Sequence, residues 1–85
     1  MNETLQSLRT REEIEDWLVG RVATWMTLDP HDVDPGRPFI EYGLASVAAV
    51  SISGELEEWL GRRVAPTALW DHPTIERLAS VLAPR

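Results

Sequence analysis

The segment between residues 28 and 44, LDPHDVDPGRPFIEYGL, places the strongest constraint on how this chain can fold. It holds three prolines and two glycines in 17 residues, which excludes a long helix or strand across it. A loop this long in an 85-residue chain is usually functional or well packed. We expect packing, with Val33, Phe39 and Leu44 as anchors in the core and the far end of the loop delivering Ser46.

The segment before this loop has the pattern of an amphipathic helix over residues 11–27. TREE at residues 10–13 matches a capping box, with Thr10 as the cap and Glu13 three residues later. Apolar residues then follow the helical period. The expected stripe consists of Ile14, Leu18, Val22 and Trp25, flanked by Trp17 and Met26.

The segment after the loop predicts a second helix, from about residue 46 to residue 60, with two different faces. Its core stripe is expected to contain Ala49, Ile52, Leu56, Trp59 and Leu60. Val47, Gly54 and Glu58 point nearly the opposite way, with Val50 and Ser51 also well off the core. Gly61 is expected to end this helix in a left-handed conformation.

The C-terminal part predicts one short helical turn and one last helix. In APTALWDH, residues 65–72, Leu69 and Trp70 should point inward, and Pro73 suits the first position of the last helix. The apolar stripe of that helix is Ile75, Leu78, Ala79 and Leu82. The fold class expected is therefore all-α, a small bundle of three main helices and one short helix. Residues 1–9 are expected to be a flexible tail, and residues 10–85 one domain.

Composition excludes several function classes. Fourteen acidic residues against eight arginines and no lysine give a net charge of −6, the opposite of a typical nucleic-acid binder. Such a charge suits partners with basic surfaces, although it also serves solubility alone. The chain has no cysteine, no apolar run long enough to span a membrane and no signal-like start. We expect a cytoplasmic protein without membrane or nucleic-acid partners.

Intrinsic catalysis and metal binding find little support. A nucleophilic serine needs a base within hydrogen-bond reach, and the only histidines are His31 and His72, both outside the predicted main helices. GLASVA is not a G-x-S-x-G elbow. The aspartates of the loop lack the glycine and the distal glutamate of a calcium loop. We expect no catalytic residue and no metal ligand.

Ser46 has two interpretations from its position alone. A serine at the start of a helix is commonly an N-cap, which stabilises by about 1 kcal/mol. The same position presents a hydroxyl beside free backbone N–H groups and the positive end of the helix dipole, a setting that favours an attached phosphate. Local pattern leaves both open.

The stretch RPFIEYGLASVAAVSISGELEEWLGRRVAPTALWDHPTIERLASVL, residues 37–82, resembles the acyl carrier proteins of polyketide synthases. Matching positions around the serine are Phe39, Gly43, Leu44, Ser46 and Val47. The stretch LEEWLGRRVAPTALWDHPTIERLA, with its Asp-x-Pro-Thr turn at residues 71–74, matches the end of the second main helix and the approach to the last.

This resemblance implies that Ser46 carries 4′-phosphopantetheine, transferred from coenzyme A by a separate magnesium-dependent transferase. The thiol of that arm would hold acyl groups as thioesters, which agrees with a chain lacking cysteine. Implied partners are the phosphopantetheinyl transferase, an acyl-loading enzyme or acyltransferase, and a ketosynthase or other synthase domains, with the carrier itself a monomer. The implied docking residues are Leu44, Ala45, Val47, Val50, Ser51, Gly54, Glu55, Glu57 and Glu58.

One departure from the family pattern concerns Ala45, where the family usually has an aspartate. That acid lies near the bound transferase and its metal, so its loss is expected to slow or restrict modification. With the rest of the motif intact, we expect a functional carrier. Two alternatives remain: a peptidyl carrier of a nonribosomal peptide synthetase, and an unmodified helical interaction domain that uses its acidic face alone.

Overall fold

The computed structural model describes residues 9–84, and the predicted all-α architecture is confirmed for them. The predicted tail, apart from Arg9, lies outside the described residues. The elements are α2 (Arg11–Met26), the 3₁₀ turns η1 (Pro30–Asp32) and η2 (Phe39–Tyr42), α3 (Ser46–Leu60), the short α4 (Ala68–Asp71) and α5 (Ile75–Leu82).

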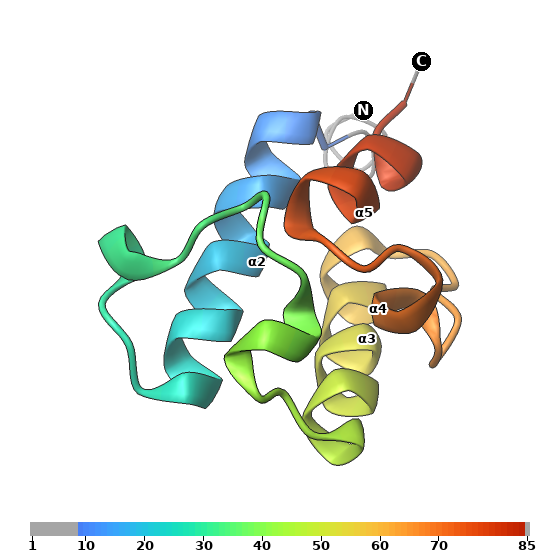
Figure 1. Cartoon of the computed structure of the whole chain (residues 1–85). Helices are drawn as coiled ribbons and strands as arrows, with labels where there is room; N and C mark the ends of the chain where they lie inside the picture. The colour runs from blue at the N-terminus through green and yellow to red at the C-terminus, as the bar shows by residue number, and fades with distance from the viewer. Residues whose placement is uncertain (1–8, 85) are drawn as a thin grey trace.

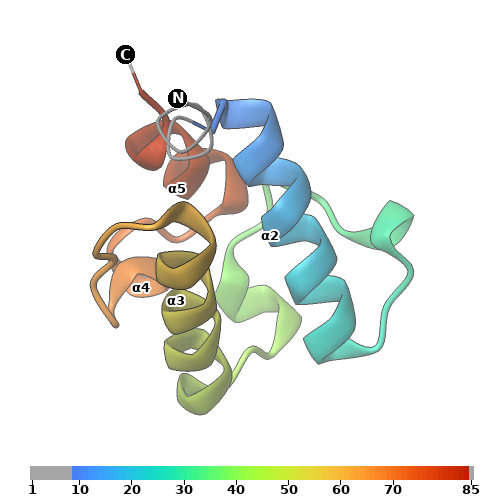
Figure 2. The same ribbon diagram turned by 180° about the vertical axis from the view of Figure 1, so that it is seen from behind.

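The helices are arranged so that α3 begins at the end of the molecule opposite to the start of α2. In Figures 1 and 2, α2 and α3 run in opposite directions, and α5 packs beside the first half of α2. The loop between α2 and α3 passes along one side, with η2 lying between the end of α2 and the start of α3. The start of α3 is therefore at the free end of the bundle, away from α5.

The core is formed by the predicted stripes together with the loop anchors. Val33, Phe39 and Leu44 are each at most 6% exposed, which confirms their predicted role. The buried side chains of the three main helices include Ile14, Leu18, Val22, Ala49, Ile52, Leu56, Leu60, Ile75, Leu78 and Ala79. Each of these helices therefore buries one apolar face against the others, as its period predicts.

The contact between α2 and α3 contains two partly exposed pairs. The rings of Trp17 and Trp59 stack with their centroids 5.3 Å apart, and the guanidinium of Arg9 lies 4.5 Å from the Trp59 centroid. Arg21 binds Glu55 through two hydrogen bonds of 3.0 and 3.1 Å. The second half of α3 is thus joined to α2 by aromatic and ionic contacts at the edge of the core.

The long loop is joined to the beginning of α5 by backbone contacts. The N–H of Phe39 donates to the carbonyl of Pro73 at 2.8 Å, and Pro38 forms an isolated antiparallel bridge with Thr74. The N–H of Glu76 donates to the carbonyl of Pro35 at 3.0 Å. These contacts, together with the buried anchors, give an irregular segment a defined course.

Two tryptophans predicted to be buried are exposed instead. Trp25, 37% exposed, lies in the last turn of α2, at the end of that helix away from α5. Trp70, 44% exposed, belongs to a helix of a single turn whose inward side is filled by Ala68 and Leu69. A helical period predicts a direction, and burial also requires a neighbour on that side.

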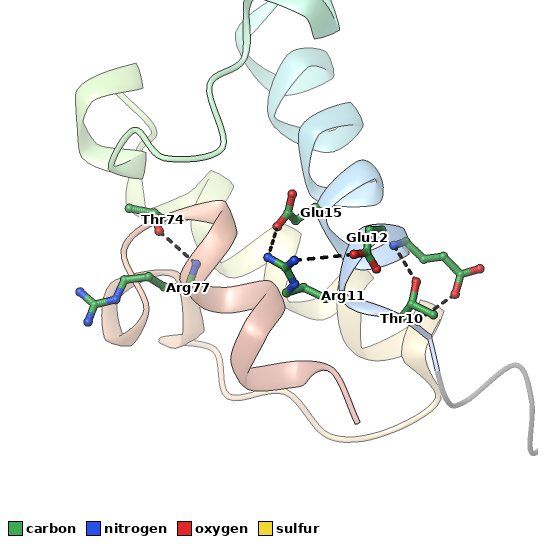
Figure 3. Close-up of polar contacts among 7 residues, drawn as sticks. Thr10, Arg11, Glu12, Glu15, Thr74 and Arg77 are labelled. Carbon is green, nitrogen blue, oxygen red and sulfur yellow. Dashed lines mark hydrogen bonds and ion pairs between the residues drawn. The ribbon is translucent and has the colours of Figure 1, made fainter. Parts of the chain in front are cut away.

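The predicted start of the last helix is also corrected. Pro73 lies two residues before α5, and Thr74 is the N-cap, its hydroxyl accepting from the N–H of Arg77 at 3.1 Å (Figure 3). Pro73 stays outside the helix, where its carbonyl accepts a hydrogen bond from the loop.

Candidate functional site

Ser46 is the first residue of α3 and does not cap it. The N-cap position belongs to Ala45, whose backbone is extended (φ −76°, ψ 161°) and whose methyl group offers no hydrogen-bond acceptor. The capping interpretation of Ser46 is therefore wrong. Within residues 9–84 the Ser46 hydroxyl makes no hydrogen bond, and the residue is exposed. A free hydroxyl at this place is available to chemistry.

The chain ahead of Ser46 holds it in position. Gly43 ends η2 in the left-handed region (φ 76°), and its N–H donates to the carbonyl of Ile40 at 3.0 Å. Leu44 then enters the core, at 6% exposure, and Ala48 and Ala49 are buried one turn into α3. Ser46 is thus an exposed residue between buried anchors on both sides.

The start of α3 carries free backbone donors and no negative charge. The first helical hydrogen bond runs from the N–H of Ala49 to the carbonyl of Ala45, at 2.9 Å. The N–H groups of Ser46, Val47 and Ala48 have no acceptor within residues 9–84, and the first turn contains no acidic residue. Residues 42–54 include no charged side chain. The positive end of the α3 dipole is therefore available to an anion at Ser46.

The predicted outward face of α3 lies where its period placed it. Val47 is 74% exposed and Val50 is 49% exposed, so an apolar surface extends from Ser46 along the helix. Ser51 is half-buried, and a Cβ built on the exposed Gly54 would, apart from its chain neighbours and its own helix backbone, meet no described atom within 4 Å. Ile40 of η2, 70% exposed, is a further large apolar side chain that the sequence pattern did not indicate.

The acidic residues expected to take part in docking differ in their availability. Glu55 is held by Arg21, and an Oε1 atom of Glu57 accepts from the N–H of Val64 at 2.9 Å. Among the three glutamates of α3, only Glu58 makes neither an ion pair nor a hydrogen bond within residues 9–84. Leu44, also named for docking, is buried in the core.

Neither histidine hydrogen-bonds to Ser46 in the part of the chain that the structure describes. His31 lies in η1, and its ring Nδ1 is 3.0 Å from Oδ1 of Asp29, the N-cap of that turn. His72 follows α4. The backbone N–H of His31, then its ring, lowers the pKa of Asp29 below its usual value. Across residues 9–84 no group of three or more His, Asp or Glu side chains is placed to bind a metal, and no helix is long and apolar enough to cross a membrane.

One buried polar group was not predicted. Ser53 is 1% exposed, and its hydroxyl donates to the carbonyl of Ala49 at 3.0 Å, with the carbonyl of Pro66 at 3.4 Å. This residue joins α3 to the segment before α4, so it is structural. In the sequence, this structural role is indicated only by the presence of a small polar residue, Ser53, seven positions after Ser46 in the predicted helix.

Comparison with known proteins identifies the family to which this chain belongs. Residues 16–82 match the family model described as phosphopantetheine attachment site. The chain is 40% identical over 77 residues, 91% of its length, to a phenolphthiocerol/phthiocerol polyketide synthase protein of Mycobacterium tuberculosis. It spans only 4% of the length of that synthase protein.

Two solved carrier structures are also similar. A free-standing peptidyl carrier protein from Acinetobacter baumannii has a TM-score of 0.82 and 38% identity, covering 86% of this chain and 91% of that one. An acyl carrier protein from Anabaena sp. PCC 7120, with a variant phosphopantetheinylation-site sequence, has a TM-score of 0.79 and 36% identity. That match covers 87% of this chain and 84% of the other.

The described residues fit the group that this family holds covalently, 4′-phosphopantetheine. Its phosphodiester needs an accessible hydroxyl and an environment that favours negative charge, and the start of α3 provides both. Domains of this family are generally non-catalytic carriers, and those of polyketide synthases work with the enzymes of the synthase. This chain belongs to the family of phosphopantetheine-attachment carrier domains, and its role is that of a carrier.

Proposed function

We propose that Ser46 is the attachment residue and that this carrier presents polyketide-type acyl intermediates to partner enzymes. The observation that supports this most directly is the free Ser46 hydroxyl at the uncapped start of α3, inside the segment that matches the family. The 40% identity to a polyketide synthase protein supports the acyl cargo. We further propose that the carrier acts in the cytoplasm, as a monomer.

The chain's own residues have a positioning role in this function. Oγ of Ser46 forms the ester to the arm, and the free N–H groups of the first turn of α3 orient the phosphodiester. Leu44 and Ala48 fix the base of the arm because they are buried on either side of it. The arm supplies a terminal thiol, which carries the acyl group as a thioester.

Tethering explains how such a small domain contributes to a synthesis. A flexible link raises the local concentration of its cargo at a partner's site to the order of millimolar. The carrier must also leave each partner, so its contact should be smaller than about 1,200 Å². Val47, Val50 and Gly54 offer such a contact beside Ser46, and Glu58 adds an acidic group for a basic partner.

The proposed partners are a magnesium-dependent phosphopantetheinyl transferase, an acyl-loading enzyme or acyltransferase, and a ketosynthase or other synthase domains. Each would approach the free end of the bundle, where α3 begins (Figure 1). The net charge of −6 over the whole chain favours the approach of partners with a basic surface.

The test is loading of the purified chain with coenzyme A, Mg²⁺ and a broad-specificity transferase, followed by intact mass and peptide mapping. We expect one phosphopantetheine mass on Ser46, complete loss of that gain in Ser46→Ala, and full loading of Ser80→Ala, an exposed serine on α5. Since the Ser46 hydroxyl makes no hydrogen bond within residues 9–84, the free energy of unfolding of Ser46→Ala should lie within about 0.5 kcal/mol of that of the parent chain. Absence of a mass gain with several transferases would contradict the proposal and favour an unmodified interaction domain.

A peptidyl carrier is the second candidate, favoured by the similarity to the Acinetobacter baumannii peptidyl carrier protein. Offering the loaded chain to a polyketide acyltransferase and, separately, to an amino-acid-activating adenylation domain distinguishes the two. Acylation by the first and not by the second supports the polyketide type, and the reverse result supports the peptidyl type.

A further inference from the structure

We propose that the phosphodiester on Ser46 serves as the missing N-cap of α3, so that loading orders the first turn of this helix and the docking surface on it. This inference rests on the proposed function, since it requires the arm to be on Ser46. It adds that the unloaded and loaded carriers differ in the surface they show to partners.

The first observation is that the N-cap of α3 has the right backbone conformation and lacks only a side-chain hydrogen-bond acceptor. Ala45 already has the extended backbone of an N-cap residue, and the first helical hydrogen bond to its carbonyl is formed. What is absent, among the residues that the structure describes, is an oxygen that accepts from the N–H groups of the first turn. In the same structure both α2 and α5 have that oxygen, from Thr10 and Thr74.

The second observation is the charge around this position. The chain carries fourteen acidic residues, yet residues 42–54 have none, and Glu41 just before them lies 3.6 Å from Arg37. A phosphodiester on Ser46 therefore meets free N–H donors without a carboxylate on its own helical turn. It also brings acceptor oxygens and one negative charge to the positive end of α3.

The third observation relates the proposed cap to the surface that partners are expected to contact. Val47 and Val50, the exposed apolar residues beside Ser46, lie in the first two turns of α3. A helix end without a cap frays, because its first donors are shared only with water. Capping by the arm would hold both valines in helical register, so partners that recognise them should bind the loaded carrier more tightly.

Amide hydrogen exchange of the parent chain, before and after loading, tests the inference without any variant. We expect the amides of Val47 and Ala48 to become at least several-fold more protected on loading. The amides of Glu12 and Glu13, in the capped first turn of α2, should not change. Equal protection before and after loading, with mass confirming the arm on Ser46, would overturn the inference and leave the proposed function intact.

A cap supplied by mutation gives a second test. Ala45→Asn places a neutral acceptor at the N-cap without adding a hydroxyl, and Ala45→Asp places a charged one. In the parent chain, loading should raise the melting temperature by about 4–8 °C, the effect of one cap on a domain of this size. In either variant, the unloaded melting temperature should rise, and the further rise on loading should fall by half or more.

Thr10→Ala provides the matched control, because it removes a cap from α2 at the other end of the molecule. It should lower the melting temperatures of both forms equally and leave the loading shift unchanged. A loading shift in the Ala45 variants equal to that of the parent would contradict the inference. A parent chain that never gains the arm on Ser46 would overturn the proposed function and this inference together.

Discussion

The starts of α2 and α3 differ in whether their first backbone N–H groups find a hydrogen-bond acceptor. At α2 the hydroxyl of Thr10 accepts from the N–H of Glu13, and the carboxylate of Glu13 accepts from the N–H of Thr10, at 3.1 and 2.9 Å (Figure 3). At α3 the cap position holds Ala45, and the first N–H groups have no acceptor in the described part of the chain. The cap of α2 already satisfies backbone donors of that helix end, whereas those of α3 remain available to an added group.

The two ends also differ in charge. The first turn of α2 holds Glu12 and Glu13, with Arg11 contacting Glu12 and Glu15 beside them (Figure 3). These groups already neutralise the positive end of the α2 dipole. The corresponding turn of α3 has no acidic residue. The start of α3 is thus the helix end that remains available to an added group, and it lies at the free end of the bundle.

The largest stability effect is expected from removing the capping box of α2. The double variant Thr10→Ala, Glu13→Ala loses both reciprocal hydrogen bonds and should lower the free energy of unfolding by about 1–2 kcal/mol. Urea denaturation followed by circular dichroism measures it. Glu12→Ala is the control, since in the described residues the Glu12 side chain has one ion pair, with Arg11, and no hydrogen bond. It should lower the free energy of unfolding by only a few tenths of about 1 kcal/mol. Similar losses in both variants would show that charge, and not capping, stabilises this end.

A smaller effect of opposite sign is expected at α3. Ala45→Asp should raise the free energy of unfolding of the unloaded chain by about 0.5–1 kcal/mol, because the backbone of residue 45 is already extended and the first turn has free donors. The same urea experiment applies. The aspartate also restores the residue usual in the family, so the rate of loading by a transferase should increase. A destabilised variant would mean that the first turn of α3 already satisfies its donors by other means.

The smallest effect concerns η1, whose cap is the exposed carboxylate of Asp29. Asp29 accepts from the N–H of His31 at 2.8 Å, which holds the pKa of Asp29 below its usual value. A folded-state pKa that is lowered stabilises the fold above the unfolded-state pKa, and this contribution is lost as pH falls through the folded value. Asp29→Asn should therefore lose slightly less stability than the parent between neutral pH and about pH 3. Identical pH profiles, or an unshifted Asp29 in an NMR titration, would contradict this.

The sequence was sufficient wherever structure depends on local pattern. The capping box at Thr10, the stripe of α3 and the left-handed Gly61 all depend on residues a few positions apart, and all were predicted. Pro73 was misplaced because its carbonyl is used by Phe39, thirty-four positions earlier. Trp25 was misplaced because burial requires a neighbour, which a period does not specify.

The candidate site was partly predictable for the same reason. The position of Ser46 at a helix start followed from local pattern and family resemblance. That the N-cap is Ala45, the residue before Ser46, is visible only in the three-dimensional structure. Pattern placed Glu55 on a face of α3, whereas its ion pair with Arg21 depends on how α2 crosses that face. Exposure of Ile40 depends on the course of the loop.

The backbone contacts between the long loop and the beginning of α5 have a consequence for how the site is assembled. Phe39 and Pro38, which lead toward Ser46, are paired with Pro73 and Thr74, residues that a ribosome adds much later. The scaffold around the serine is therefore complete only after the last helix has docked. A nascent or trimmed chain can therefore contain Ser46 and still lack the scaffold that the proposed loading requires.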